Sequence, residues 1–233
     1  MTPRVFLKRY SDPARGIAAR HHRDWLEHLD SGVRIPRAHP GSAMLQILDR
    51  LDGTQPDPTD LVDLAAALGQ LHGAAYEREL HAARLDRPFT VGTGLTIPDF
   101  RAGRQQVLAH FGVQADGPAA FYKDANIRNF VITPTGPAVV DFDDLTLAPF
   151  GYDLAKLVVS AAMTYGPLPA DQLHDGLRAY NSAVAAAGGP ERACSGDELA
   201  IYAEIHHALT RRYLNRKGYQ HAWPDVRPWP SPA

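Results

Sequence analysis

The sequence has one cysteine, Cys194, among its 233 residues. A single thiol excludes an internal disulfide and any zinc site built from cysteines, and it fits the reducing cytoplasm. No apolar run approaches the roughly 20 residues that a helix needs to cross a bilayer. The opening residues, MTPRVFLKRYSD, lack the apolar segment of a signal peptide. We therefore expect a cytoplasmic protein with no membrane partner.

Neither sign of charge is in excess. The chain has 24 Lys and Arg against 26 Asp and Glu, a formal net charge of −2. Nucleic-acid-binding domains carry a basic patch or stripe, so nucleic acid is not an expected partner. Hydrophobic residues make up 45% and charged residues 21%, a balance typical of globular proteins. The length is enough for one large domain or two lobes with a full core.

The first fifty residues mix strand and helix patterns. The run RVFLKRY predicts a strand, and Asp12 with Pro13 then predicts the start of a helix over Pro13–Leu29. The run SGVRIPRAHPG is a turn-rich connection. A second strand is expected over AMLQILDRL, followed by a turn at LDG.

Helical patterns prevail from Thr59 onward, beginning with TDLVDLAAALGQLHGAAY and PDFRAGRQQVLAHFG. Two short strands, FVIT and AVVDF, are joined by the turn PTGP. Later helices are expected over Tyr152–Met163, over Ala170–Ala187 and from Asp197. The Pro-rich end, WPDVRPWPSPA, should lie extended on the surface or fray. Together the patterns predict an α+β fold with a small lobe over residues 1–53 and a larger, mostly helical lobe over 54–233.

The stretch FYKDANIRNFVITPTGPAVVDFDDL, residues 121–145, carries a chemically suggestive set of polar side chains. Asp124 and Asn129 lie on one loop, and Asp141 and Asp143 follow the hairpin. Charged groups near the middle of a fold are costly to bury, so they persist where they bind a metal, do chemistry or complete a network. A structural hairpin with solvated acids is the alternative, and it explains the ordered spacing less well.

Phosphoryl transfer requires this combination of side chains. Mg²⁺ neutralises charge on the transferred group, and a carboxylate must lie beside the acceptor hydroxyl. In a D-x-x-x-x-N loop the Asp can accept the hydroxyl proton while the Asn ligates Mg²⁺, and a hairpin can return a second Asp to the metal. Mg²⁺ prefers oxygen ligands, so these residue types suit it. Here DANIRN and VVDFDD supply Asp124, Asn129 and Asp141.

These motifs resemble those of the aminoglycoside phosphotransferase and choline kinase family, which shares the protein-kinase-like fold. The family pattern is H-G-D-x-x-x-x-N, a hairpin, a strand ending I-D-F/W-D/E, and a helix start like G-x-x-x-D-L-A. This chain has YKDANIRN, VVDFDD and FGYDLAKLV, and its LGQLHG resembles the family's L-x-x-L-H. The resemblance covers Val5 to about Val159, and the first fifty residues match only loosely. It implies a two-lobe kinase-like fold with a reduced N-terminal lobe.

The resemblance also implies roles for the acidic block. Asp124 is expected to be the catalytic base, with Asn129 and Asp141 as metal ligands. Asp143 is expected to be an accessory carboxylate on the metal or phosphate side. Asp153, on the following helix, is expected to support the catalytic loop through backbone amides.

The nucleotide is expected to contact the small lobe. Lys8, in VFLKRY, resembles the lysine that reaches the α- and β-phosphates. Its acidic partner should lie on the next helix, where Asp24 and Glu27 are candidates and Glu27 is preferred. The strand LQILDRLDG resembles the one that leads to the adenine site, so three residues are expected to offer backbone groups to the base: Leu48, Asp49 and Arg50.

The chain departs from the family pattern in three places. Tyr122-Lys123 replaces the His-Gly before the catalytic Asp. Lys123 then adds a cation that could hold phosphate or lower the pKa of the carboxylate, and Arg128 could also contact phosphate. The sequence begins almost at the lysine strand, so the two strands and Gly-rich loop that should cover the phosphates are expected to be missing. The third departure is on the helix after the lysine strand: the segment ARHHR occupies the position at which the acidic partner, a Glu, would first be aligned.

The favoured hypothesis is a Mg²⁺-dependent kinase that moves the γ-phosphoryl group of ATP or GTP to a hydroxyl of a small molecule. An aminoglycoside-like antibiotic, an amino sugar or a related metabolite is the expected acceptor, bound by a monomer or homodimer. A cationic acceptor could meet acids in the helical region, namely Asp171, Asp175, Asp197, Glu198 and Glu204. The alternatives are a non-catalytic nucleotide- or ligand-binding module and a sugar kinase of another class.

Overall fold

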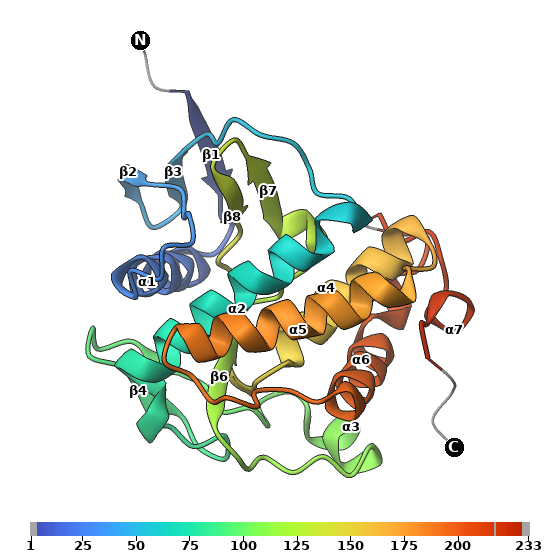
Figure 1. Ribbon diagram of the computed structural model, residues 1–233. Coiled ribbons are helices and arrows are strands. Elements are labelled where there is room, and N and C mark those ends of the chain that lie inside the picture. The colour runs from blue at the N-terminus through green and yellow to red at the C-terminus, as the bar shows by residue number, and fades with distance from the viewer. Residues whose placement is uncertain (1–3, 217, 230–233) are drawn as a thin grey trace.

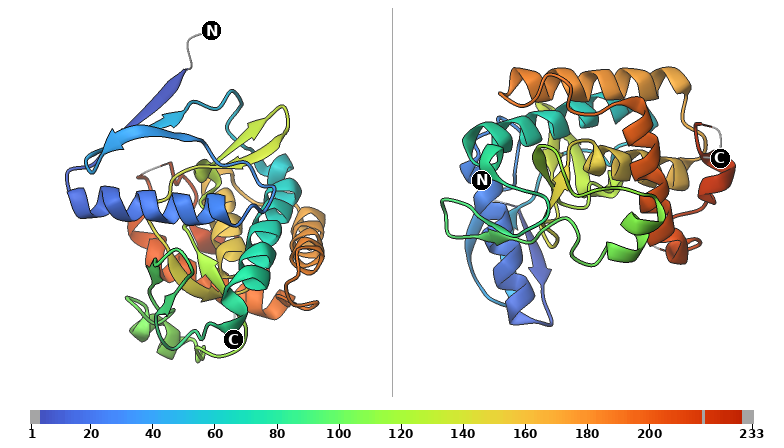
Figure 2. Two further views of the ribbon diagram at one scale, coloured as in Figure 1. Left: turned by 90° about the vertical axis from the view of Figure 1, so that its left-hand side faces the viewer. Right: turned by 90° about the horizontal axis from the view of Figure 1, so that it is seen from below.

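The computed structural model describes residues 4–216 and 218–229. Its N-terminal part is a three-stranded antiparallel sheet with one helix beneath it (Figures 1 and 2). The sheet order is β1-β3-β2, so β3 is central and pairs Phe6 with Leu48 and Lys8 with Gln46. The elements of this part are β1 (Val5–Arg9), α1 (Pro13–His28), β2 (Ala38–Ser42) and β3 (Leu45–Asp49).

The start of α1 follows directly from its sequence. The Asp12 carboxylate accepts a hydrogen bond of 2.9 Å from the Ala14 N–H, and Pro13 occupies the first turn, where no N–H is needed. The helix then buries Trp25 and Leu26 against the core. The predicted helix is confirmed to within one residue.

The rest of the chain is mostly helical, with short strands between the helices (Figure 1). Its helices are α2 (Leu61–Arg78), α3 (Gln105–His110), α4 (Tyr152–Tyr165), α5 (Ala170–Ala186), α6 (Gly196–Thr210) and α7 (Trp223–Val226). Its strands are β4 (Phe89–Thr90), β5 (Thr96–Ile97), β6 (Ala119–Tyr122), β7 (Phe130–Thr133), β8 (Gly136–Val139) and β9 (Thr146–Pro149). Single 3₁₀ turns lie at Pro58–Asp60, Leu80–Ala82, Ile127–Asn129 and Arg211–Tyr213. No helix in the described ranges is long and apolar enough to cross a membrane.

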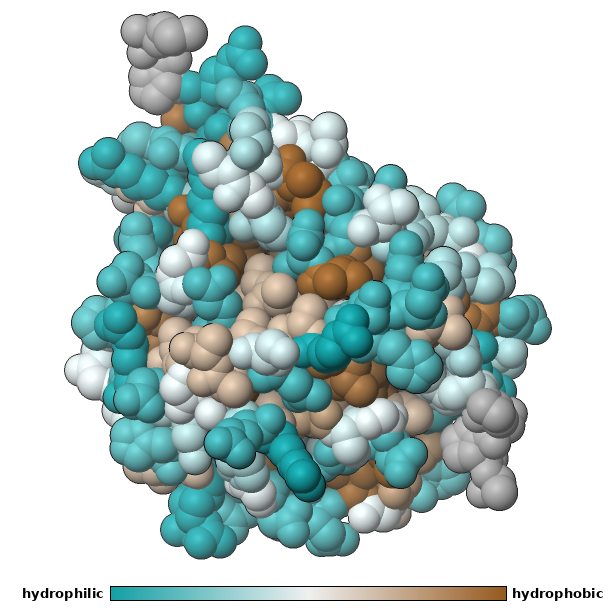
Figure 3. All heavy atoms as spheres, in the orientation of Figure 1, coloured by the Kyte–Doolittle hydropathy of each residue, from teal (hydrophilic) through white to brown (hydrophobic). Residues whose placement is uncertain are grey.

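Helices α2 and α5 pack side by side at very short range (Figures 1 and 2). Two glycines one turn apart on α2 make this possible, because a Cβ at Gly69 or Gly73 would lie 2.4 or 2.5 Å from a backbone oxygen of α5. The outer face of this pair carries weakly hydrophobic side chains along its middle, with hydrophilic side chains around them (Figure 3).

The hairpin β7–β8 connects the two parts of the chain. Isolated bridges join Arg34 to Ala138 and Thr54 to Ile132, and the Val139 N–H donates to the Arg34 carbonyl at 3.0 Å. The hairpin therefore lies beside the N-terminal sheet (Figure 1).

Two sequence predictions were wrong in detail. Only α3 forms within the helix expected over PDFRAGRQQVLAHFG, because the Asp99 carboxylate binds the N–H groups of Arg101 and Ala102 in a turn and Gly103 has φ +72°. The connection SGVRIPRAHPG contains most of β2.

The end of the chain is more ordered than its proline content indicated. Trp223 begins the short helix α7, is fully buried, and donates from Nε1 to Glu204 Oε1 at 2.8 Å. The last part of the predicted extended tail, residues 230–233, lies outside the described residues.

Candidate active site

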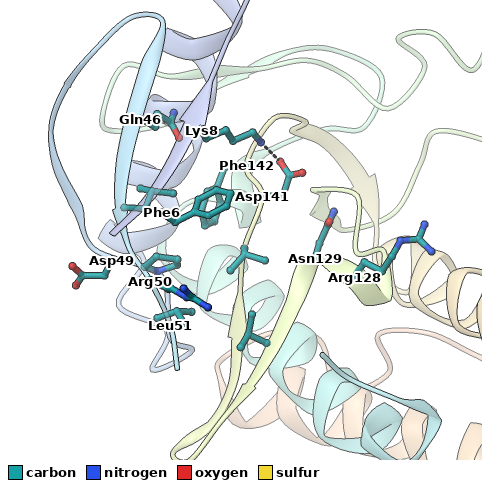
Figure 4. A pocket seen from close by; sticks show the side chains of 14 residues that line it. Phe6, Lys8, Gln46, Asp49, Arg50, Leu51, Arg128, Asn129, Asp141 and Phe142 are labelled. Carbon is teal, nitrogen blue, oxygen red and sulfur yellow. Dashed lines mark hydrogen bonds and ion pairs between the residues drawn. The ribbon is translucent and has the colours of Figure 1, made fainter. Parts of the chain in front are cut away.

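A cleft of about 350 Å³ lies between the N-terminal sheet and the β7–β8 hairpin (Figure 4). Its apolar walls come from both sides: Phe6, Pro36, Leu48 and Leu51 from the sheet part, and Val131, Val140 and Phe142 from the hairpin part. Lys8, Asn129 and Asp141 also line it. The Lys8 ammonium group lies against Asp141 in this cleft (Figure 4).

The cleft is lined by three residues that the sequence predicts to contact the nucleotide base, namely Leu48, Asp49 and Arg50. The Asp49 N–H donates to the Arg37 carbonyl at 2.8 Å and the Arg50 N–H donates to the Arg4 carbonyl at 2.9 Å, so a contact of the three residues with the base through their other backbone groups stays a prediction. These two donors complete the sheet, so they are not free for a ligand.

Asn129 and Asp141 are brought together by the open end of the hairpin. Phe130 pairs with Val139, and the Val140 N–H donates to the Asn129 carbonyl at 2.9 Å. The Asn129 amide nitrogen donates to the Asp124 carbonyl at 2.8 Å, which leaves its side-chain oxygen as the atom available to a cation. The D-x-x-x-x-N spacing and the hairpin thus place both side chains at one site.

Lys8 reaches this same site from β1. Its ammonium group lies 2.6 Å from Asp141 Oδ1 and 2.6 Å from Asp143 Oδ1 (Figure 4 draws the Asp141 contact). Burial lowers the pKa of Lys8, but the two carboxylates outweigh burial and leave that pKa raised. Burial likewise raises the pKa of Asp141, and Lys8 outweighs it and leaves that pKa lowered. Both groups are therefore charged at neutral pH.

The acidic partner of Lys8 is not on α1. Glu27 binds Arg23 at 2.9 Å, Asp24 also binds Arg23, and neither contacts Lys8. The reason is geometric, since Arg23 is buried on α1 and draws both acids to itself. Asp143 supplies the missing partner from the hairpin side.

Asp143 is the most heavily engaged acid of the site. Its Oδ1 contacts Lys8 and accepts from the Tyr10 hydroxyl at 3.0 Å, and its Oδ2 contacts Arg15 at 3.0 Å. Its side chain is 13% exposed, compared with 43% for Asp141. Asp143 therefore makes ion pairs that tie α1 and β1 to the site, and its expected accessory role on the metal or phosphate side stays a prediction.

Asp124 lies on the loop between β6 and β7. Its Oδ1 accepts from the Tyr122 hydroxyl at 3.1 Å and contacts Lys156 Nζ at 3.1 Å. Its side chain is 30% exposed. The carboxylate predicted as the base is thus fixed on one oxygen and accessible from outside.

Asp153, at the start of α4, holds this loop as expected. Its two oxygens accept from the Lys123 N–H at 3.1 Å and the Ala125 N–H at 2.7 Å, so it binds the backbone on both sides of Asp124. Asp153 is fully buried, and burial raises its pKa to about 6. His72 Nε2 lies 4.0 Å away from Asp153, and burial lowers the pKa of His72 to about 3.

Lys123 does not reach the cleft. It is 1% exposed, its ammonium donates to the Val140 carbonyl at 3.4 Å, and it lies 5.5 Å from the centroid of the Phe130 ring. Burial lowers its pKa. The phosphate contact expected from the sequence is wrong, because Lys123 turns inward and instead braces the residue before Asp141.

Arg128 lines the cleft but points away from Asp141 (Figure 4). Its guanidinium donates to Thr164 Oγ1 at 3.1 Å and lies 4.8 Å over the Tyr219 ring. These contacts fix Arg128 to α4 and to the late segment of the chain, so its expected phosphate contact is not made in this arrangement.

The donor set suits Mg²⁺ bound together with phosphates. No group of three or more His, Cys, Asp or Glu side chains that could hold a metal occurs within the described residues. Mg²⁺ is commonly held by one or two carboxylates while substrate phosphates and water complete its shell. The oxygens of Asn129 and Asp141 fit that pattern, and the Lys8 ammonium already lies against Asp141.

The acids expected to meet a cationic acceptor are spread over other surfaces. Asp171 is exposed at the start of α5, Asp175 pairs with Arg178, and Asp197 is exposed at the start of α6. Glu198 caps α6 through Ser195, and Glu204 is buried against Trp223. These contacts give local structural roles to Asp175, Glu198 and Glu204.

Sequence reasoning missed Lys156 and Tyr219. Lys156 lies in YDLAKLV, directly after the motif residues, and Tyr219 lies far along the chain in a segment without a motif. The Asn126 side chain donates to the Tyr219 hydroxyl at 2.8 Å. A lone lysine within the run LAKLVV, whose other residues are all apolar, is the one signal that could have identified Lys156.

Known structures with this fold include several small-molecule kinases. An aminoglycoside-3′-phosphotransferase of type VIII is 19% identical with TM-score 0.57, over 87% of this chain and 84% of that chain. The macrolide 2′-phosphotransferase MphH from Brachybacterium faecium is 17% identical with TM-score 0.57, over 91% and 78%. The choline kinase LicA from Streptococcus pneumoniae is 14% identical with TM-score 0.54, over 90% and 76%. At these identities the likeness shows the kinase-like fold.

The sequence itself identifies the family. No curated protein matches it significantly. The profile of the phosphotransferase enzyme family (APH) matches residues 2–193, most of the chain and all of the predicted catalytic block. That match and the α+β kinase-like fold confirm the resemblance drawn from the motifs, and the chain belongs to the APH phosphotransferase enzyme family.

Proposed function

We propose that this protein transfers the γ-phosphoryl group of ATP or GTP to a hydroxyl of a small molecule. The observation that carries the proposal is that Lys8, Asn129 and Asp141 line one largely apolar cleft, with Lys8 in contact with Asp141. The base, Asp124, lies on the same loop as Asn129. The side-chain amide of Asn129 donates to the backbone carbonyl of Asp124. The proposed lobes are a small N-terminal lobe over residues 1–53 and a larger, mostly helical lobe over residues 54–233.

Each residue has a role in the proposed reaction. Phe6, Leu48 and Val131 pack against the nucleotide base, and Lys8 moves from Asp141 to the phosphates when the nucleotide binds. Asn129 and Asp141 hold Mg²⁺, which when bound neutralises charge on the transferred group.

Asp124 orients the acceptor hydroxyl and takes its proton. The acceptor oxygen forms a bond to the γ-phosphorus, the bond from that phosphorus to the β–γ bridging oxygen breaks, and the nucleoside diphosphate leaves with the electron pair. The proton remains on Asp124 until it passes to solvent. Most of the rate enhancement comes from positioning and charge stabilisation, to which a base adds about 10²–10⁴-fold.

The acceptor class is the finer part of the proposal. Aminoglycoside-like antibiotics and amino sugars remain the first candidates, since two of the structural neighbours are named as phosphotransferases of an aminoglycoside and a macrolide. The five acids predicted to bind a cationic acceptor are engaged or exposed elsewhere, so they do not support a strongly cationic one. The expected setting is the cytoplasm, as a monomer or homodimer.

The test is an unbiased search for the acceptor. The protein is incubated with a metabolite extract and γ-labelled MgATP or MgGTP, and labelled products are separated and identified. Transfer of label to a small molecule, dependent on Mg²⁺ and lost in Asp141→Ala, supports the proposal. Nucleotide binding without transfer to any acceptor would favour a binding module.

A further inference from the structure

Two side chains from different elements meet on one oxygen of Asp124. Lys156 Nζ, from α4, lies 3.1 Å from Asp124 Oδ1, and the Tyr122 hydroxyl, from β6, donates to the same Oδ1 at 3.1 Å. Within the described part of the chain, no hydrogen bond or ion pair reaches Oδ2. The two oxygens of one carboxylate are therefore in different surroundings.

Lys156 is itself held from the far side. Its side chain is 7% exposed, and the Tyr219 hydroxyl interacts with its ammonium group. The same hydroxyl accepts from the Asn126 amide at 2.8 Å. Tyr219 is fixed in turn, because the next two N–H groups, those of Gln220 and His221, donate to the Met163 carbonyl at 2.8 and 3.0 Å. The ammonium group therefore has a fixed position next to the catalytic loop.

From these contacts we propose that Lys156 is a positioning residue for the base: it fixes Oδ1 of Asp124 and leaves Oδ2 to accept the proton of the acceptor hydroxyl. The inference rests on the proposed function for the identity of the acceptor, but the geometry it invokes can be measured without it.

The chemistry favours this role over a purely structural one. A carboxylate that is 30% exposed on a loop can rotate about two side-chain bonds, and misplacement by about 1 Å can cost about 10²-fold in rate. The ammonium group of Lys156 is buried, and an ion pair with a buried charge is costly to form and often replaceable by apolar side chains without loss of stability. The pair lies here at the one loop where orientation decides catalysis. The other nearby acid, Asp153, is occupied by two backbone N–H groups.

The position of the pair also separates it from the nucleotide. Lys156 does not line the cleft, whereas Lys8 does. A change at Lys156 should therefore alter the chemical step and leave nucleotide affinity unchanged. A lysine that bound the phosphates would change both.

The test combines crystal structures with kinetics for the parent, Lys156→Met, Tyr122→Phe and the double variant. Methionine keeps the length and the buried packing but cannot donate. Phenylalanine keeps the ring and loses only the hydroxyl. Tyr165→Phe is the matched control, because the Tyr165 hydroxyl donates to the Pro56 carbonyl, away from the catalytic loop.

We expect Lys156→Met to leave Asp124 in more than one side-chain orientation, with kcat lowered about 10²-fold and the dissociation constant for MgATP unchanged. Tyr122→Phe should act in the same direction to a smaller extent. The loss of kcat in the double variant, expressed as a free energy, should be smaller than the sum of the two single losses, because both residues act on one oxygen. Lys156→Arg, which still donates, should restore a single orientation.

Two results would overturn the inference. One is a Lys156→Met structure in which Asp124 keeps its single orientation. The other is a loss of MgATP affinity in parallel with turnover, which would make Lys156 a phosphate ligand. If the parent transfers phosphate to no acceptor, the proposed function fails, and the crystallographic orientation of Asp124 still decides the positioning role.

Discussion

Asp124 and Asp141 share a backbone feature that few residues adopt. Their φ angles are +62° and +65°, in the left-handed region that favours glycine. Aspartate tolerates this region better than most side chains, yet such conformations cost about 1–3 kcal/mol and persist where the surroundings determine them. Around Asp124, these surroundings are the hydrogen bonds that Asp153 and Asn129 make with the loop. For Asp141, they are its contact with Lys8.

Asp141 is the residue on which nucleotide binding should depend most. We expect Asp141→Ala to abolish Mg²⁺-dependent binding of ATP, because it removes the carboxylate of the proposed two-residue metal site. The chain should stay folded, since the side chain is 43% exposed. Calorimetric titration with MgATP measures the first effect and circular dichroism the second. Asp175→Ala, on the surface of α5, is the control, and a variant that binds MgATP as tightly as the parent would disprove the metal assignment.

At the scale of elements, α4 positions the catalytic loop through one buried carboxylate. The folded pKa of Asp153 is about 6, above the usual value of 3.8, so the folded state binds more protons between these pH values. Stability contributed by the protonated form is therefore lost as pH rises from about 4 to 6.

This linkage is tested with Asp153→Asn, which cannot ionise. The free energy of unfolding of the parent minus that of the variant should decrease by about 2–3 kcal/mol between pH 4 and pH 7. Urea denaturation at each pH measures it. A difference that is constant or that grows with pH would mean that Asp153 stays charged in the folded protein, compensated by Lys123.

The close packing of α2 against α5 depends on glycine. Gly73→Ala should destabilise the protein by about 1–3 kcal/mol, although alanine favours helices, because the new methyl group would lie 2.5 Å from the Val184 carbonyl oxygen and 2.7 Å from Ala187. Gly196→Ala is the matched control, as nothing lies within 4 Å of its added Cβ. Equal midpoints in urea for the two variants would contradict this account of the interface.

The elements that sequence patterns predicted well are those with local signals. Asp12 and Pro13 determine the start of α1, and apolar spacing determines α2. Strand β2 was missed because its residues, AHPGS, have turn composition and become a strand only by pairing with β3. Helix α3 is short because the Asp99 turn competes with it.

The residues of the candidate site show the same difference between local sequence signals and tertiary contacts. Asp124, Asn129, Asp141 and Lys8 could be predicted because their spacing or their strand carries the motif. The wrong Glu27 partner and the unforeseen Lys156 both depend on tertiary contacts, which bring together residues 135 and 32 positions apart (Lys8 with Asp143, Lys156 with Asp124). No local pattern encodes such pairs.

At the scale of the whole molecule, the cleft joins the two parts of the chain, so a ligand bound there should stabilise both. MgATP at about 100 times its dissociation constant should add about 2.7 kcal/mol and raise Tm by roughly 5–10 °C. The shift should disappear with EDTA, because the phosphates then meet no bridging metal. Differential scanning calorimetry with MgATP, ATP plus EDTA, and Mg²⁺ alone measures it, and an equal shift with and without EDTA would contradict a metal-bridged site.

The central claim is that this chain is a phosphotransferase whose base is Asp124. Steady-state phosphate transfer to the acceptor identified by the metabolite search tests it most directly, with the parent and Asp124→Asn compared at saturating MgATP. Asparagine keeps the shape but cannot take the proton, so kcat should fall about 10²–10⁴-fold while the dissociation constant for MgATP changes little. Near-parental turnover by Asp124→Asn would contradict the mechanism.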